Sequence, residues 1–414
     1  MKTPKKRIKT IDLFAGCGGL MEGFERTGEY ETLACVEWEK APCENLVNRL
    51  SNKWQYANAK KKVLRFDIQR TQELFQGWND IEYGENNGLD SLIGHEVIDM
   101  IVGGPPCQAY SLAGRIRDEN KMKNDYRNYL FESYLKVVNH YKPKLFIFEN
   151  VPGMLSAAPD GELIIDKIKR SFENYGYKLT DNLKSSIIDL TEFGIPQNRK
   201  RIIILGVNEN YYKEKSSEII EFFYEKMLLK FKTKKMTVKE AISDLPKLYP
   251  SPKTFKINGK NYSHIFGSSF LQNHLPRFHN DRDIGIFRLL AKDIESGDKK
   301  YIRTKELKEL YSKVTGKKSN VHKYYVLRWN EQSNTIPAHL YKDGLRHIHP
   351  DPEQARSITV REAARLQTFD DDYVFSGSIM EQYKMIGNAV PPKFSYVLAQ
   401  LLNEIINKYD RRDI

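Results

Sequence analysis

The sequence predicts an α/β protein: a doubly wound, mostly parallel, Rossmann-like sheet with a second, smaller domain inserted. Short apolar runs alternate with helical patterns up to residue 207, and a glycine-rich turn follows the first run. Regular patterning then weakens and resumes at residue 357. We therefore expect a first domain at 1–207, an inserted domain at 208–354, and a C-terminal segment, 355–414, that returns to the first domain.

The individual elements follow from local residue patterns. Strands are expected where short runs of apolar residues end at Gly, Asp, Glu or Asn. These runs lie at 9–15, 32–36, 63–66, 97–102, 145–148 and 201–207. Helices are expected where apolar residues recur on one face, at 20–27, 41–50, 130–140, 360–367 and 393–408. Strands separated by helices at this spacing favour parallel pairing.

The positive charge is concentrated in the predicted insertion. The 414 residues include 66 Lys+Arg and 54 Asp+Glu, a net charge of +12. Residues 211–350 hold 28 basic and 15 acidic residues, so this segment carries +13 and the remainder −1. A localised basic excess suggests a polyanionic partner such as nucleic acid, although a solvated lysine-rich surface gives the same total.

Composition excludes several classes of protein. Hydrophobic residues make up 40% of the chain, enough for a packed core, and no apolar run is long enough to span a membrane. The four cysteines form no CxxC pair, which argues against a zinc site or a disulfide framework and fits a reducing cytoplasm. We expect no metal site.

A glycine-rich turn follows the first predicted strand. Residues 12–20 read Asp-Leu-Phe-Ala-Gly-Cys-Gly-Gly-Leu, a turn that lets a ligand approach the backbone at the carboxyl edge of the sheet. Glu37 ends the next strand, where a carboxylate can accept hydrogen bonds from ribose hydroxyls. The third glycine of the dinucleotide fingerprint is absent, so a nucleoside ligand such as S-adenosylmethionine fits better than NAD.

A single thiol follows another predicted strand. The segment 103–108 reads Gly-Gly-Pro-Pro-Cys-Gln, and two prolines fix the backbone before Cys107. A nucleophilic thiolate explains this segment better than a small buried hydrophobe does. Cys17 is the competing nucleophile, but it lies between the glycines of the first turn and has little freedom to attack. Cys35 and Cys43 are expected to be structural.

Charged side chains flank two further strands. Glu149 ends a buried apolar strand and precedes Asn-Val-Pro-Gly, so its carboxyl can donate or share a proton with a bound base. Arg199 and Arg201 are expected on one face of a strand, where they either grip a carbonyl or phosphate or merely flank a sheet edge. Near the C-terminus, 386–392 reads Ile-Gly-Asn-Ala-Val-Pro-Pro, which predicts a turn before the last helix.

Together these motifs closely resemble those of the bacterial DNA (cytosine-5-)-methyltransferases. Six motifs match in the family's order, and the resemblance covers nearly everything outside the insertion. They are 12–20, 105–108, 149–151, 197–201, 359–367 and 387–391. The resemblance implies transfer of a methyl group from S-adenosylmethionine to carbon 5 of a flipped-out cytosine in double-stranded DNA, leaving S-adenosylhomocysteine.

The same resemblance assigns roles to individual residues. Cys107 would add to carbon 6 of the cytosine, and Glu149 would bind its ring nitrogen 3 and exocyclic amine. Arg201 would bind the carbonyl oxygen, with Arg199 in support. The cofactor site would be lined by Phe14, Gly16, Gly18, Glu37, Trp38, Asp67, Pro106, Leu130 and Asn388. In that site, the resemblance implies that the Trp38 ring stacks on the adenine and that the Glu37 carboxylate binds the ribose.

The resemblance also implies how the chain meets its partners. The segment 111–128 is expected to close over the DNA. The first domain is expected to be catalytic, and the insertion, 208–354, is expected to be the target-recognition domain. We expect a monomer in the cytoplasm, with no membrane contact and with a companion restriction endonuclease as a possible partner. Two alternatives stay open: an RNA cytosine-5 methyltransferase of the same fold, and a non-catalytic DNA-binding regulator, which would not need Cys107 together with Glu149.

Overall fold

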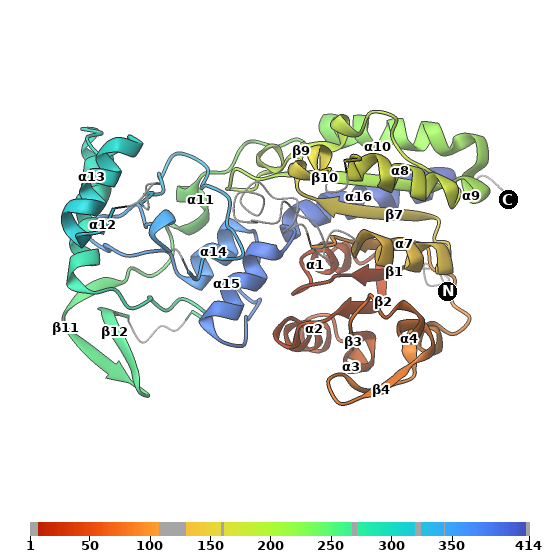
Figure 1. The fold of residues 1–414 in the computed structure, drawn as a ribbon, viewed down its shortest axis with the longest axis horizontal. Helices are drawn as coiled ribbons and strands as arrows, with labels where there is room; N and C mark the ends of the chain where they lie inside the picture. Colours follow the sequence, from red (N-terminus) through yellow and green to blue (C-terminus); the bar gives the residue numbers. More distant parts are fainter. Residues whose placement is uncertain are drawn as a thin grey trace, which may run out of the picture. The chain divides into compact units, whose positions relative to one another are not determined.

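The computed structural model describes residues 7–106, 130–158, 161–266, 271–318, 324–342 and 344–410 (Figure 1). The chain divides into two compact units. Unit 1 consists of Met1–Phe193, Lys200–Thr233 and Ala389–Ile414. Unit 2 consists of Gly194–Arg199 and Lys234–Asn388.

Unit 1 contains the sheet and the helices that cover it. Its strands are β1 (Ile8–Leu13), β2 (Tyr30–Glu37), β3 (Val63–Arg65), β4 (Trp78–Asp80), β5 (Gly84–Asn86), β6 (Met100–Gly103), β7 (Leu145–Asn150), β8 (Tyr177–Lys178), β9 (Ile187–Asp189) and β10 (Lys200–Asn208). Its α-helices are α1 (Gly19–Glu25), α2 (Lys40–Asn52), α3 (Ala59–Lys62), α4 (Thr71–Gln76), α5 (Gly88–Ile93), α7 (Leu130–Tyr141), α8 (Ile164–Asn174), α9 (Glu209–Tyr212), α10 (Ser216–Lys230) and α16 (Pro392–Tyr409).

The main sheet confirms the predicted mostly parallel, doubly wound fold. Its strand order is β3-β2-β1-β6-β7-β10-β8, with β9 also paired to β10. The pairs from β3 to β7 are parallel, whereas β10 runs antiparallel to β7, β8 and β9. The chain steps outward from β1 through β2 to β3 and then returns to β6 on the other side of β1. In open α/β sheets, ligands bind at such a switch point, beyond the carboxyl ends of the strands.

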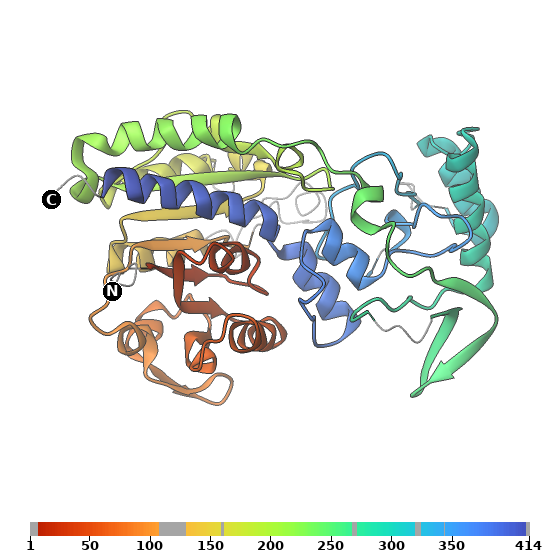
Figure 2. The same cartoon turned by 180° about the vertical axis from the view of Figure 1, so that it is seen from behind.

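Helices cover both faces of this sheet. One face packs against α4, α5, α7 and α8 in a single apolar core, and the other carries α1 and α16, with α10 beside α16 (Figure 2). Glycine at position 23 allows the contact between α1 and α16, because an added Cβ would lie 2.3 Å from the Tyr396 nitrogen. The residues 145–148 of β7 are fully buried, as the continuous apolar run of a central strand predicts.

Unit 2 is less regular. Its elements are α11 (Val238–Ile242), β11 (Tyr249–Ile257), β12 (Lys260–Ile265), α12 (Asp281–Ser296), α13 (Thr304–Thr315), α14 (Val360–Leu366) and α15 (Ile379–Asn388). Buried side chains of α12 and α13 share an apolar core with Tyr324, Val326 and Ile348. Both α11 and α14 begin with a capping box, Thr237 with Glu240 and Thr359 with Glu362, which satisfies backbone amides that the first helical turn leaves free.

The boundaries of the compact units differ from the expected division at 207/208 and 354/355. Residues 208–233 belong to unit 1 because α10 packs against β10 and α16. Residues 355–388 belong to unit 2 because α14 packs against α11 and α15. Unit 2 holds 28 basic and 18 acidic residues, so it carries +10 of the net charge of +12. Among the described helices, none is both long and apolar enough to cross a bilayer.

Candidate active site

The glycine-rich turn after β1 leaves an open surface at the switch point. Phe14, Gly16 and Gly18 all have positive φ angles (56°, 55° and 82°), a conformation that glycine adopts without strain. A Cβ added to Gly16 would meet no atom of the described residues within 4 Å, which leaves room for a ligand over the backbone there. At Gly18 a Cβ would come within 2.7 Å of Leu46, so this glycine is required by packing as well as by its φ angle.

The Glu37 carboxylate fixes the shape of this turn. One oxygen, Oε2, accepts a hydrogen bond from the Gly16 amide (2.9 Å), and Oε1 accepts from the amides of Trp38 and Glu39 (2.9 Å each). Burial raises the pKa of Glu37, and the three amides partly oppose that shift. The side chain therefore joins the end of β2 to the turn after β1.

Two further predicted cofactor residues lie close to Glu37 in the fold. The Glu37 carbonyl accepts from the Phe66 amide (3.0 Å), which brings Asp67 to the same sheet edge. Oδ1 of Asp67 accepts from the Gln69 amide (2.9 Å), and its other oxygen has no hydrogen-bond partner among the described residues. Trp38 is 45% exposed, so its indole face is available for stacking.

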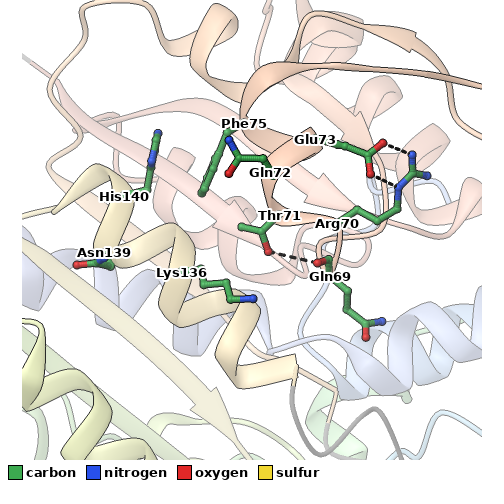
Figure 3. A pocket seen from close by; sticks show the side chains of 9 residues that line it. All are labelled: Gln69, Arg70, Thr71, Gln72, Glu73, Phe75, Lys136, Asn139 and His140. Atoms are coloured by element: carbon green, nitrogen blue, oxygen red, sulfur yellow. Dashed lines mark hydrogen bonds and ion pairs between the residues drawn. The ribbon is translucent and has the colours of Figure 1, made fainter.

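A cavity of about 520 Å³ lies between α4, with the two residues before it, and α7 (Figure 3). The Arg70 guanidinium is its strongest charge, but it is paired with both Glu73 and Asp80. The His140 ring stacks on Phe75 with centroids 3.9 Å apart. The cavity thus holds partnered Arg70 and His140 side chains, whereas its Lys136 pairs with no carboxylate among the described residues. It is lined by Gln69, Arg70, Thr71, Gln72, Glu73, Phe75, Lys136, Asn139 and His140.

A buried carboxyl lies beneath the glycine turn. Asp12, in β1, is 2% exposed, and its carboxyl oxygens make no hydrogen bond of standard geometry among the described residues, although the Met21 amide lies near enough to interact with them. Burial raises the pKa of Asp12 to about 8; the Met21 amide opposes the shift and the Glu37 charge adds to it. The protonated form is therefore the stable one in the folded chain at neutral pH.

This carboxyl predicts how stability depends on pH. The pKa of Asp12 rises from 3.8 to about 8 on folding, so between these pH values the folded state binds more protons than the unfolded state does. The free energy of unfolding therefore falls as the pH rises through this range. Asp12→Asn keeps the shape and removes this titration. Between about pH 5 and pH 8, the free energy of unfolding in urea should fall less for the variant than for the wild type. If the free energy of unfolding depends on pH in the same way in the wild type and in Asp12→Asn, the pKa of Asp12 is not raised by folding.

Glu149 and Arg201 form an ion pair at the carboxyl end of β7. Arg201 Nε lies 2.7 Å from Glu149 Oε1, and both side chains are mostly buried. The antiparallel pairing of β10 with β7 sets this contact, since Ile202 lies opposite Asn150. Glu149 Oε2 faces Gly104, where an added Cβ would lie only 2.6 Å away. The pair therefore borders the segment that leads to Cys107.

Asn150 links the end of β7 to the segment that precedes Cys107. Its Nδ2 donates to the Pro105 carbonyl (3.2 Å), and its Oδ1 accepts from the Val151 amide (2.9 Å). Asn150 belongs to the motif at 149–151, but the sequence analysis assigned it no role. Its place at the end of an apolar strand was the available signal, because a buried amide side chain there needs hydrogen-bond partners on a neighbouring segment. Its position indicates that it holds the end of β6 beside Glu149.

Arg199 lies in a different environment from Arg201. It is 2% exposed and donates to the backbone carbonyls of Ile336 (3.4 Å) and Gly387 (3.3 Å) within unit 2. The expected alternation on one strand face does not apply, because β10 begins at Lys200. The neighbouring Gln197 is fully buried and likewise bonds backbone, at the Leu366 carbonyl (2.9 Å).

The remaining predicted site residues differ in how much the structure says about them. Cys107 and the segment 111–128 lie outside the described residues. Pro106 is half-buried at the end of the described segment, and Leu130 packs in the apolar core of unit 1. Asn388 is the exposed last residue of α15, in unit 2. Within the described part of the chain, no three His, Cys, Asp or Glu side chains are arranged to hold a metal ion.

Comparisons with known proteins point to one family. A model described as C-5 cytosine-specific DNA methylase matches residues 8–404. The chain is 34% identical over 453 residues to the type II methyltransferase M.Bpa9945I of Bacillus paralicheniformis, covering 96% of this chain and 99% of that protein. It is 30% identical over 403 residues to the type II methyltransferase M1.HphI of Haemophilus parahaemolyticus, with coverages of 97% and 87%.

A solved structure supports the fold independently. A candidate DNA modification methyltransferase encoded within an E. coli prophage aligns over 97% of this chain and 99% of its own, with a TM-score of 0.60. Its sequence is only 21% identical to this chain, so the likeness concerns the fold.

Proposed function

Because the chain belongs to the C-5 cytosine-specific DNA methylase family, whose members use S-adenosylmethionine, we propose that Cys107, Glu149 and Arg201 are its catalytic residues. The protein is a DNA cytosine-5 methyltransferase. The observation that supports this assignment of residues most strongly is the Glu149–Arg201 ion pair beside Gly104, three residues before Cys107.

The chemistry requires activation of a poor carbon nucleophile. Addition of the Cys107 thiolate to carbon 6 of cytosine breaks the 5,6 double bond and makes carbon 5 nucleophilic as part of an enamine. S-adenosylmethionine supplies the methyl group. Loss of the carbon-5 proton and elimination of the thiolate then restore the aromatic ring and the free enzyme. The base must leave the helix stack to reach these groups.

Glu149 and Arg201 would stabilise the adduct. The Glu149 carboxyl would bind ring nitrogen 3 and the exocyclic amine, which distinguishes cytosine from thymine. Arg201 Nε contacts Oε1 of Glu149, and Oε2 lies beside Gly104, where we place the base. Nη1 of Arg201 donates to the Lys200 carbonyl (2.8 Å), so the donors that remain on the guanidinium would bind the base carbonyl. Arg199 is buried against backbone carbonyls, so we assign it a positioning role.

The described residues fit an S-adenosylmethionine site. Gly16 leaves open space over the turn, Trp38 exposes its ring for adenine, and Asp67 has a free oxygen for the adenine amine. Glu37 accepts three amides and retains one lone pair for the ribose. Phe14, Gly18, Pro106, Leu130 and Asn388 complete the proposed set.

The partners follow from the charge distribution and the relatives. We assign residues 208–354, within which the positive charge is concentrated, to target recognition on double-stranded DNA. The relatives named type II methyltransferases favour a modification enzyme that works with a restriction endonuclease. We also propose that the protein acts as a monomer in the cytoplasm. Bisulfite sequencing of DNA from cells that make the protein should then find one short sequence methylated at every copy.

Trapping tests the proposed nucleophile. Duplex DNA with 5-fluorocytosine at the target cannot lose a proton from carbon 5, so a covalent adduct should accumulate only when S-adenosylmethionine is present. Cys107→Ala should form no adduct, whereas Cys17→Ala should still form it. An adduct with Cys107→Ala would refute the nucleophile, and modification of RNA alone would favour the RNA-modifying alternative.

Gly104→Ala should inactivate the enzyme without unfolding it. The new Cβ would lie 2.6 Å from Glu149 Oε2, so the carboxylate must move while the backbone stays in an allowed conformation. Because misplacement by about 1 Å costs roughly 100-fold in rate, kcat should fall by about that factor. Gly285→Ala, at a site with open space in α12, is the control and should keep wild-type kcat.

A further inference from the structure

The β11–β12 ribbon is the most exposed regular element of unit 2. Among the described strands these two pair only with each other, forming a two-stranded sheet that projects from the rest of the unit (Figure 1). Several of its large apolar side chains are exposed to solvent, among them Tyr249 (46% exposed), Ile257 (41%) and Ile265 (53%). An exposed two-stranded ribbon is one of the two protein shapes that the major groove of B-DNA admits.

The ribbon is positively charged. Residues 245–280 contain five Lys and Arg residues and no Asp or Glu. Lys253, Lys256 and Lys260 are exposed, and none of them pairs with a carboxylate among the described residues. Lys247, at the base, is paired with Asp351 at 3.8 Å. The unpaired lysines therefore lie along the projecting part, where they complement a polyanion.

The two faces of the ribbon differ. Phe255 lies opposite Tyr262, and their rings stack with centroids 5.8 Å apart on a half-buried face. Lys256 lies opposite Asn261, and both are exposed. Since side chains alternate along a strand, this second pair points to the other face. That face presents an ammonium and a carboxamide side by side, groups that can read guanine and adenine edges.

The base of the ribbon is held in place by buried hydrogen bonds. His264 is fully buried, and its Nε2 bonds the Gln354 carbonyl (2.9 Å) while Nδ1 meets the Ser263 hydroxyl (3.0 Å). The same hydroxyl accepts from the His279 amide (2.9 Å). Burial lowers the pKa of His264 to about 4, so it stays neutral. The ribbon is thus anchored at one end, with a free tip at Asn258-Gly259.

Exposed strands can also pair with another protein chain. Here Pro250 and Pro252 remove two backbone donors from β11, and lysines line the edge; both features disfavour strand addition. The positive charge without carboxylates and the exposed Lys256–Asn261 pair favour nucleic acid over a protein partner.

We infer that the β11–β12 ribbon enters the major groove of the duplex substrate, with Lys253 and Lys260 on phosphates and Lys256 and Asn261 at base edges. This inference rests on the proposed target-recognition role of residues 208–354. It assigns phosphate contact and base reading to different side chains of one hairpin, so the two roles can be separated by experiment.

Salt dependence tests the phosphate contacts. Binding to a short duplex carrying the methylated sequence is measured by fluorescence anisotropy over a series of salt concentrations. The Lys253→Gln/Lys260→Gln variant should weaken binding on every sequence and reduce the slope of log Kd against log salt by about two. The control is Lys305→Gln, an exposed lysine of α13 in the same unit. If Lys305→Gln weakens DNA binding as much as each of the two ribbon substitutions does on average, the inference is overturned.

Site preference tests base reading. Asn261→Ala should lower affinity for the recognition sequence by roughly tenfold and spread methylation to sites that differ at one base pair, with non-specific affinity unchanged. Wild-type specificity in both Asn261→Ala and Lys256→Ala would refute the reading role. If the wild type methylates no duplex DNA, the proposed function fails instead; if it does and the ribbon variants behave like it, only this inference fails.

Discussion

Replacing Glu149 with glutamine is expected to slow methyl transfer by about two to three orders of magnitude, with little effect on S-adenosylmethionine affinity. Glutamine keeps the size of the side chain but can neither carry the charge nor release a proton to ring nitrogen 3. Single-turnover kinetics with duplex DNA measure the rate, and calorimetry measures cofactor affinity. The effect should appear in kcat, because the interaction strengthens as the adduct forms.

Arg201 provides the matched comparison, because its Nε lies 2.7 Å from Glu149 Oε1. Arg201→Met removes both this contact and the proposed contact with the base carbonyl, so it should also lower kcat strongly. Groups that act as a unit are not additive, so the double variant should be little slower than Glu149→Gln alone. Additive losses would show that the two side chains act independently. Wild-type kcat in Glu149→Gln would remove Glu149 from the mechanism.

The central sheet could be predicted from the sequence because its signals are local. The six predicted strands all occur, since each is a short local run of apolar residues. The exposed ribbon, β11 and β12, was not predicted. Its sequence has two prolines and three lysines, so it lacks the alternation that a half-buried strand needs. The Asn258-Gly259 turn was the one local signal for it.

The partners of individual side chains were beyond sequence reasoning. The ion pair of Glu149 with Arg201 depends on the antiparallel register of β10 against β7, which no local pattern specifies. The burial of Arg199 depends on carbonyls of Ile336 and Gly387, far away in the sequence. Residue types and spacing can therefore indicate a chemistry, whereas the geometry that distinguishes Arg201, the proposed catalytic arginine, from Arg199, the proposed positioning one, comes from long-range packing.

The second large expected effect concerns the stability of unit 2. Arg356 and Glu362 are almost completely buried and form two parallel hydrogen bonds of 2.7 Å. Glu362 also accepts from the Thr359 amide at the start of α14 (2.7 Å). Burial opposes ionisation of Glu362, yet the Arg356 guanidinium holds the pKa of that carboxyl well below its usual range. The pair is therefore charged in the folded protein.

Glu362→Ala should destabilise the protein by about 3–5 kcal/mol in urea unfolding, because it leaves a buried guanidinium without its counter-charge and removes the capping box of α14. The control is Asp244→Ala, which breaks an exposed pair with Arg365 and should cost less than about 1 kcal/mol. Equal losses in the two variants would mean that burial does not set the cost.

The pH dependence separates charge from packing. Glu362 has a depressed pKa in the folded state, so its contribution is present above the unfolded pKa of 4.5 and is lost as pH falls below it towards the folded value. The stability difference between wild type and Glu362→Gln should therefore shrink on acidification. Arg356→Met with Glu362→Leu should recover much of the stability lost in Glu362→Ala, because apolar groups of similar size can replace a buried ion pair, whereas an unpaired buried charge cannot be accommodated.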